Sequence, residues 1–175
     1  MTQTHSDAPT KYEDLQKAIH TYGAAAFENL LRCKGLGLAI VDNIHTYLGC
    51  ERNRVAVVPP EGQFDPQKDY GDEAFSFSQR PVIVLEPVHF GISLIVQNSE
   101  DSGALWLRTV LSIEVTGDSF DVFVASQPLL RVPLQYDDHL TPVFEAIYKE
   151  FIKTFEMEVM EFNDARFKNG IGFLP

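Results

Sequence analysis

The sequence predicts a two-layer α+β fold, with an N-terminal helix pair, an antiparallel sheet of five to six strands in meander order, and a long C-terminal helix packed on the sheet. Apolar residues recur with a helical period in the first third and near the end of the chain, and with a period of two between them. The turns within residues 82–134 are too short for the crossover that parallel strands need, so we expect antiparallel pairing. No repeat or linker divides residues 1–175, which predicts a single α+β domain.

The first third of the chain predicts two helices. Thr10 and Glu13 have the spacing of a capping box, and apolar residues then recur at steps of three and four. Gly35 and Gly37 predict a break, although a single long, bent helix is the open alternative. The expected segments are a flexible N-terminus over 1–10, a first helix over 11–33 and a second over 38–48.

The middle of the chain alternates apolar and polar residues, which is typical of strands. Pro59 and Pro60 end the first strand, and five acids against one lysine predict an exposed acidic loop over 59–73. Gly117 and Asp118 together indicate a tight hairpin turn. The strand-like segments are 55–58, 74–78, 82–85, 89–96, 105–115, 120–124 and 129–134.

The C-terminal segment predicts a long helix that ends at Asn169–Gly170, followed by a short tail over 172–175. Thr141 and Pro142 mark its start, because a proline at the first helical position loses no hydrogen bond. A continuous apolar stripe on this helix is expected to seal the sheet. We expect burial of Phe144, Phe151, Ile152 and Phe155, and solvent exposure of Glu145, Lys149, Glu156 and Glu161.

The formal net charge is -11, and the whole surplus lies in residues 55–175, which carry 19 acids and eight bases. Residues 1–54 carry six of each. Such a surface repels phosphate groups, so binding to nucleic acid or to an anionic membrane is excluded and a basic protein partner is favoured. The chain shows neither a signal peptide at its start nor an apolar run of the ~18 residues that span a membrane, so we expect a cytoplasmic location.

The sequence lacks the common signatures of nucleotide binding, zinc proteases, serine hydrolases and thiol redox chemistry. Cys33 and Cys50 are 17 residues apart, which fits neither a disulfide scaffold nor a zinc ribbon. We therefore expect no cofactor and no metal, and the sequence leaves open whether the protein is an enzyme.

Three residues are candidates for catalysis. Glu86 and His89 flank a proline at a turn between two strand-like segments, where a general acid and base would converge on a substrate. His139 ends the run 136–139, which also contains two aspartates and directly precedes the last helix. That run has the ligands for a divalent metal, but capping of the helix is the simpler account.

Two further groups have simpler structural interpretations. His45 lies near Asp42 and Cys50 in the sequence, but side chains five positions apart on a helix point in different directions. A surface histidine and a small packing cysteine are the simpler account, and Cys33 is expected to be a buried packing residue. The acids of the 59–73 loop do not follow the calcium-loop pattern.

The sequence thus favours a non-catalytic binding or regulatory protein whose acidic surface meets a basic protein partner. The alternative is a small-molecule-binding protein or enzyme with an apolar pocket between the sheet and the helices. The charge-balanced N-terminal helices also predict a homodimer, because two copies meet there without repulsion.

Overall fold

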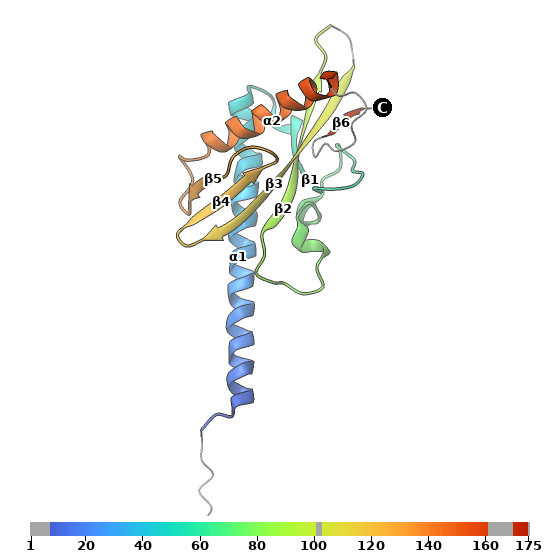
Figure 1. Ribbon diagram of the computed structural model, residues 1–175. Helices are drawn as coiled ribbons and strands as arrows, with labels where there is room; N and C mark the ends of the chain where they lie inside the picture. Colours follow the sequence, from blue (N-terminus) through green and yellow to red (C-terminus); the bar gives the residue numbers. More distant parts are fainter. Residues whose placement is uncertain (1–7, 101–102, 161–169, 175) are drawn as a thin grey trace, which may run out of the picture.

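The computed structural model describes residues 8–100, 103–160 and 170–174 (Figure 1). The expected helix end at Asn169, the exposure of Glu161 and most of the flexible N-terminus lie outside these residues. The elements are α1 (Lys11–Leu48), β1 (Val55–Val58), β2 (Val88–Gln97), β3 (Ala104–Thr116), β4 (Ser119–Val124), β5 (Leu130–Pro133), α2 (Thr141–Met160) and β6 (Gly170–Phe173), with short 3-10 helices at Arg52–Arg54, Gly71–Ala74 and Ser76–Gln79.

The α+β class and the antiparallel sheet are confirmed. Strands β1 to β5 follow one another in the order of the chain, and each pairs antiparallel with its neighbours. Strand β6 joins the same sheet by pairing with Leu105–Arg108 of β3. The expected tail over 172–175 is therefore wrong at Gly172 and Phe173, which belong to β6. A Cβ atom added at Gly172 would lie 1.9 Å from the Trp106 ring, so only glycine lets the strand pass there.

The predicted N-terminal helix pair is wrong, because α1 is one helix of 38 residues. The capping box at its start is confirmed: the backbone N–H of Thr10 donates to the Glu13 carboxylate at 2.6 Å, and that of Glu13 donates to the Thr10 hydroxyl at 3.2 Å. Gly37 does not break the helix, because it lies where the Phe75 and Phe90 rings pack against the backbone of α1. Packing against the body of the protein thus outweighs the low helix propensity of glycine.

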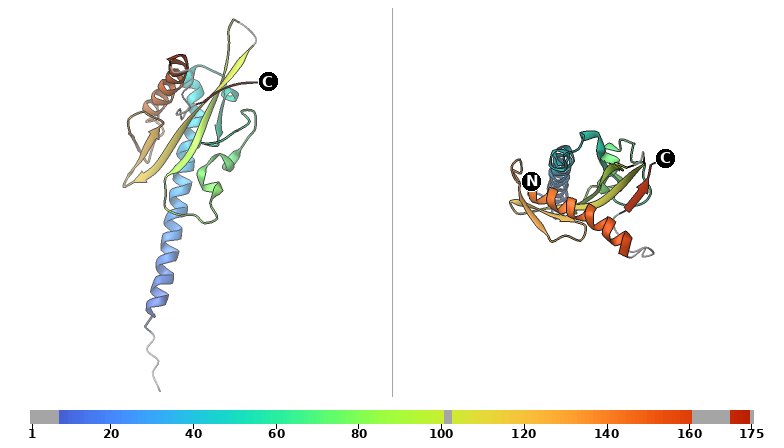
Figure 2. Two further views of the ribbon diagram at one scale, coloured as in Figure 1. Left: turned by 45° about the vertical axis from the view of Figure 1, so that its right-hand side comes forward. Right: turned by 90° about the horizontal axis from the view of Figure 1, so that it is seen from above.

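The described part of the sheet and the two helices enclose one hydrophobic core, and Figures 1 and 2 show how these elements are arranged. The second half of α1 packs into it with one face, the strands contribute the residues that share a face with Phe90 and Leu111, and α2 closes it. The fully buried residues of α1 include Cys33, Leu36, Ile40 and Ile44, and those of the strands and α2 include Ile92, Leu107, Ile113, Val122 and Ile147.

The first half of α1 projects from the body as an isolated rod (Figures 1 and 2). Every residue from 11 to 25 is exposed, and Ala26 is the first buried one. We call residues 11–25 the stalk. The sequence periodicity predicts that the stalk is helical. It does not predict that the stalk is exposed on all sides, because a helix with an apolar stripe normally packs against a core.

The strand-like segments 74–78 and 82–85 do not form strands. The first is divided between 3-10 helices, where Phe75 stacks on Phe77 with ring centroids 5.3 Å apart. The second lies next to α1 and not beside another strand, with the backbone N–H of Leu85 donating to the Tyr22 hydroxyl at 3.0 Å. Neither segment forms a strand ladder, and the side chains of Val82 and Leu85 in the second one are exposed.

The first part of the acidic loop over 59–73 packs on the sheet face that carries Trp106 and Arg108, and Asp72 near the end of the loop pairs with Lys34 of α1. The Arg108 guanidinium of β3 donates to the carbonyl oxygen of Pro59 at 3.2 Å and lies 4.7 Å from the centroid of the Phe64 ring. The Phe64 ring also meets Trp106 edge-on. One arginine and one aromatic pair thus attach the loop to the sheet.

Helix α2 buries Phe144 and Phe151, as expected, while Phe155 is only half-buried. The expected burial of Ile152 is wrong, because 42% of this residue is exposed. The charged residues expected in water, Glu145, Lys149 and Glu156, are exposed. The apolar stripe of α2 is therefore wider than the core that it covers, and its edge faces solvent.

Candidate functional site

An acidic groove of about 630 Å³ lies between the second half of α1 and the start of α2. It is lined by Ala39, Asn43, Thr46, Tyr47, Tyr136, Asp137, Asp138, Leu140, Thr141 and Phe144. The groove contains two carboxylates and two tyrosines. Tyr47 comes from α1, whereas Tyr136 and the two aspartates come from the segment before α2, about 90 positions further along the sequence.

The carboxylates of Asp137 and Asp138 are both exposed, and neither forms an ion pair with any residue that the structure describes. Asp42, by contrast, is paired with Arg52 at 2.6 Å. The Tyr47 ring lies 5.8 Å from the ring of Phe144 and is partly exposed. Carboxylates beside aromatic faces suit a lysine or arginine side chain, which gains both an ion pair and a cation–π contact.

An apolar groove of about 390 Å³ lies further along α2, where this helix meets the end of α1, the end of β2 and the start of β3. Its lining is Leu48, Cys50, Arg54, Leu94, Ile95, Val96, Gln97, Leu107, Tyr148, Phe151, Ile152 and Phe155. Tyr148 and Ile152 are 46% and 42% exposed, so the groove opens to solvent along α2. At its rim the Arg54 guanidinium donates to the side-chain oxygen of Gln97 at 3.4 Å.

The structure gives Glu86 and His89 separate surroundings. The Glu86 carboxylate pairs with Arg80 at 3.1 Å, in the segment before β2. His89 is exposed on β2, and its backbone N–H donates to the Ser76 hydroxyl at 2.9 Å. Neither residue lines the acidic groove or the apolar groove. Glu86 lines a small hollow between α1 and the segment before β2, but its volume of about 10 Å³ leaves no room for a substrate. The role of both residues in catalysis stays a prediction.

His139 is exposed just before α2, and its backbone N–H donates to the carbonyl oxygen of Tyr136 at 2.8 Å. The described residues contain no group of three or more His, Cys, Asp or Glu side chains placed to hold a metal ion. In the loop over 59–73, Asp65 and Asp69 each accept a backbone N–H two residues further on. These two carboxylates therefore act as turn caps.

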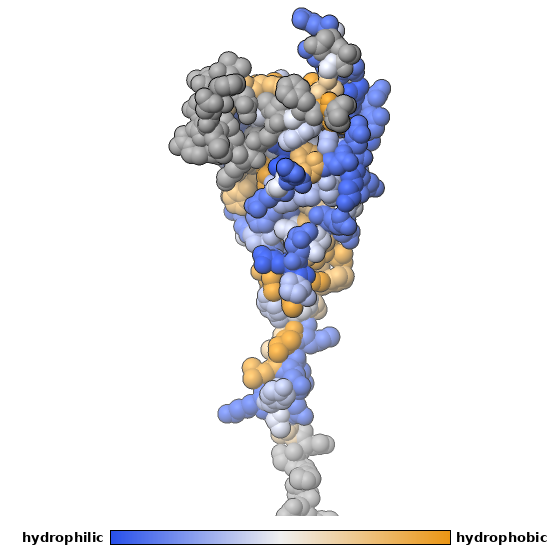
Figure 3. All heavy atoms as spheres, turned by 90° about the vertical axis from the view of Figure 1, so that its right-hand side faces the viewer, coloured by the Kyte–Doolittle hydropathy of each residue, from blue (hydrophilic) through white to orange (hydrophobic). Residues whose placement is uncertain are grey.

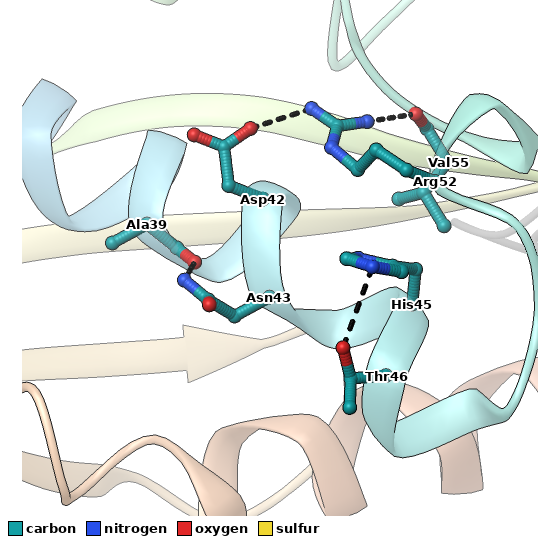
Figure 4. Close-up of polar contacts among 7 residues, drawn as sticks. All are labelled: Ala39, Asp42, Asn43, His45, Thr46, Arg52 and Val55. Carbon is teal, nitrogen blue, oxygen red and sulfur yellow. Dashed lines mark hydrogen bonds and ion pairs between the residues drawn. The ribbon is translucent and has the colours of Figure 1, made fainter.

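Asp42 and His45, which lie near Cys50 in the sequence, form their polar contacts with other residues (Figure 4). The Asp42 carboxylate turns to Arg52, which also donates to the carbonyl oxygen of Val55 at 2.8 Å. His45 Nε2 lies 3.3 Å from the Thr46 hydroxyl. The carboxylate thus fastens the turn after α1 and does not orient the imidazole.

A polar network that sequence reasoning missed joins the turn after β4 to α2. Ser126 and Gln127 donate to the buried Glu150 carboxylate at 2.7 and 2.8 Å, and Lys153 Nζ donates to Ser126 Oγ at 2.5 Å. The preceding Ala125 has a φ of 43°, which is rare for a non-glycine residue. The network therefore fastens the turn after β4 to α2 and satisfies the buried Glu150 carboxylate.

The two cysteines differ in accessibility and in the pKa of their thiols. Burial, with a smaller contribution from the Glu114 carboxylate, raises the pKa of Cys33 to about 12, while burial raises that of the partly exposed Cys50 less strongly. The sulfur of Cys33 also lies 3.7 Å from the side-chain oxygen of Asn29. Neither thiol is poised as a nucleophile at neutral pH.

We expect alkaline pH to destabilise the protein through Cys33. The folded state keeps this thiol protonated up to a pH of about 12, whereas the unfolded thiol ionises near 9.0, so the stabilisation is present below pH 9 and is lost as the pH rises toward 12. Between about pH 9 and 10.5 the loss is about 2 kcal/mol, at 1.4 kcal/mol per pH unit. Urea unfolding at pH 9 and at pH 10.5 measures this loss. Between these two pH values, the free energy of unfolding of Cys33→Ala should fall by about 2 kcal/mol less than that of the wild type.

The chain matches no protein-family model, no curated protein and no solved structure. None of the described helices, the 38-residue α1 included, carries the apolar run that crossing a bilayer requires. What the protein does is therefore inferred from its own grooves and charges.

Proposed function

We propose that the protein is a binding module that docks a basic, amphipathic segment of a partner protein along α2. The observation that carries this proposal is the acidic groove, in which the carboxylates of Asp137 and Asp138, which pair with no described lysine or arginine, line the same groove as the tyrosines. The surplus of acids in residues 55–175 supports it, because that charge attracts a basic partner from a distance.

The spacing along α2 specifies what such a segment looks like. Phe144 lines the acidic groove, and Tyr148 and Ile152 line the apolar groove at successive steps of four residues. At 1.5 Å per helical residue the two grooves are about 12 Å apart along the helix axis. A partner would cover that distance with about four extended residues or two turns of helix, placing a lysine or arginine at one end and an apolar side chain at the other.

A second candidate function is the binding of a small apolar ligand in the apolar groove. Its volume of about 390 Å³ falls within the range of about 300–1,000 Å³ for ligand pockets. Arg54 and Gln97 provide the polar groups at its rim. A ligand of this class would bind without dependence on salt, which distinguishes it from a basic protein segment.

The test is capture of the partner on the immobilised protein, followed by measurement of its dissociation constant at about 50 and 500 mM NaCl. We expect a basic partner whose binding weakens at high salt. Replacing Asp137 and Asp138 together by asparagine should weaken binding about tenfold, because two charge-assisted contacts are lost.

The matched control removes two carboxylates elsewhere, by Glu100→Gln with Asp118→Asn on exposed hairpin turns, and should change affinity less than threefold. Equal losses in the two double variants would mean that net charge, and not the acidic groove, determines binding. Failure to recover a basic partner, or affinity that is insensitive to salt, would contradict the proposal.

A further inference from the structure

The stalk carries an apolar stripe that the described part of the chain leaves largely uncovered. Its four large side chains are exposed by 45–71%: Tyr12, Leu15, Ile19 and Tyr22. Figure 3 shows apolar residues on the narrow helix below the body of the molecule. Such a stripe, made of successive residues on one helix, is the usual sign of a helix that packs against something.

The stripe has the spacing of a coiled coil. Its residues lie three, four and three positions apart, and the same spacing continues through Ala26 and Cys33 into the core. This face of α1 is thus buried against the body of the protein in the second half of the helix and exposed to solvent in the first half. Since most helical stability comes from packing of the apolar face, a partner for the stalk would stabilise it substantially.

The positions beside the stripe favour close approach of another helix. They are Gln16, Ala18, Gly23 and Ala25, which are uncharged and mostly small, and all are exposed. The stalk also contains two acids and two lysines, so its formal charge is zero on a chain of net charge -11. It is the segment where a second acidic copy meets the least repulsion.

We infer that the stalk pairs with the stalk of a second copy of this chain in antiparallel orientation. With a two-fold axis beside Lys17, Leu15 of one copy lies next to Ile19 of the second copy, and Tyr12 lies next to Tyr22 of the second copy. Each of the four stripe residues then has a partner from the same stripe, as an isologous interface requires.

The distribution of charge decides the orientation. Antiparallel stalks place the two acidic bodies at opposite ends of the helix pair, whereas parallel stalks would bring them side by side. The antiparallel arrangement also brings the start of each stalk to the exposed loop residues of the other copy, Val82 and Leu85, because Leu85 bonds to Tyr22. These loop residues enlarge the apolar interface.

The first experiment measures the mass of the full chain by light scattering and sedimentation at concentrations around 10–100 µM. We expect the mass of two 19.7-kDa chains. Leu15→Glu with Ile19→Glu should halve the mass. Thr21→Glu with Ala24→Glu adds the same charge to the opposite face of the stalk and should leave the dimer intact.

Circular dichroism and thermal unfolding check that the Leu15→Glu/Ile19→Glu variant keeps its folded body, because both substituted residues are exposed on the stalk. A monomeric wild type at about 100 µM would overturn the inference. So would a dimer that persists in the variant with both stripe substitutions.

The second experiment tests the orientation by cysteine cross-linking in a Cys50→Ser background, where the remaining Cys33 is buried. A mixture of Tyr12→Cys and Tyr22→Cys chains should form a mixed disulfide under mild oxidation, while each chain alone should not. A disulfide between two Tyr12→Cys chains would overturn the antiparallel arrangement. The stalk is separate from both grooves, so these results do not depend on the proposed function.

Discussion

Replacing Phe151 by alanine is expected to lower the free energy of unfolding by about 3–5 kcal/mol. Phe151 is 3% exposed and packs in the core between α2 and the sheet. Removing its ring deletes buried apolar surface and leaves a cavity beside the apolar groove. Such a loss is a large part of the 5–15 kcal/mol that stabilises a typical domain, and urea unfolding of the two proteins measures it.

Two neighbours on α2 provide controls for this prediction. Ile152→Ala should cost at most about 1 kcal/mol, because 42% of Ile152 already faces solvent. Glu156→Ala should change stability by less than about 0.5 kcal/mol, because this side chain is exposed. If the three substitutions had equal effects, the assignment of a buried and an exposed face to α2 would be wrong.

Gly37→Leu is expected to destabilise the protein by about 3 kcal/mol. A Cβ atom built at Gly37 would lie 3.1 Å from the Phe90 ring and 3.2 Å from the Phe75 ring, and both rings are fully buried. A leucine adds three further carbon atoms at this point, so the rings or α1 itself must move. Thermal unfolding should show a lower midpoint, with loss of near-ultraviolet signal from the displaced rings.

Gly35→Ala is the matched control in the same helix. A Cβ atom there would meet only the Tyr136 hydroxyl, at an ordinary contact distance of 3.6 Å. The higher helix propensity of alanine should therefore dominate and stabilise the protein by about 0.5–1 kcal/mol. Opposite signs at positions 35 and 37 are the expected result, and a stabilising Gly37→Leu would contradict the ring packing described for α1.

Local patterns predict much of the fold. Alternation of apolar residues predicts strands β1 to β5 within one or two residues of their ends, and the turn at Gly117 predicts the hairpin between β3 and β4. The capping box at Thr10 and the left-handed Gly49 mark the two ends of α1. In each case a few neighbouring residues suffice to determine the conformation.

The remaining features depend on contacts between distant parts of the chain. Gly37 predicts a break in the helix, because the sequence does not reveal that the Phe90 ring packs against it. Strand β6 is too short to show a period, and its pairing with β3 joins residues more than 60 positions apart. The same holds for the acidic groove, where Asp137 alone is explained as a helix cap and the sequence does not reveal that it lines a groove with Tyr47 of α1.

Helix α1 is continuous from the stalk into the core. The number of residues between the stalk and the core therefore determines the direction in which the exposed stripe points relative to the body. One residue inserted after Ala25 would rotate the stripe by about 100° around the helix axis and advance it by about 1.5 Å. Seven inserted residues would restore the direction to within about 20° while lengthening the rod by about 10 Å. Changes of length in steps of seven therefore nearly keep the direction of the stripe, whereas a single insertion or deletion turns it toward another side of the molecule.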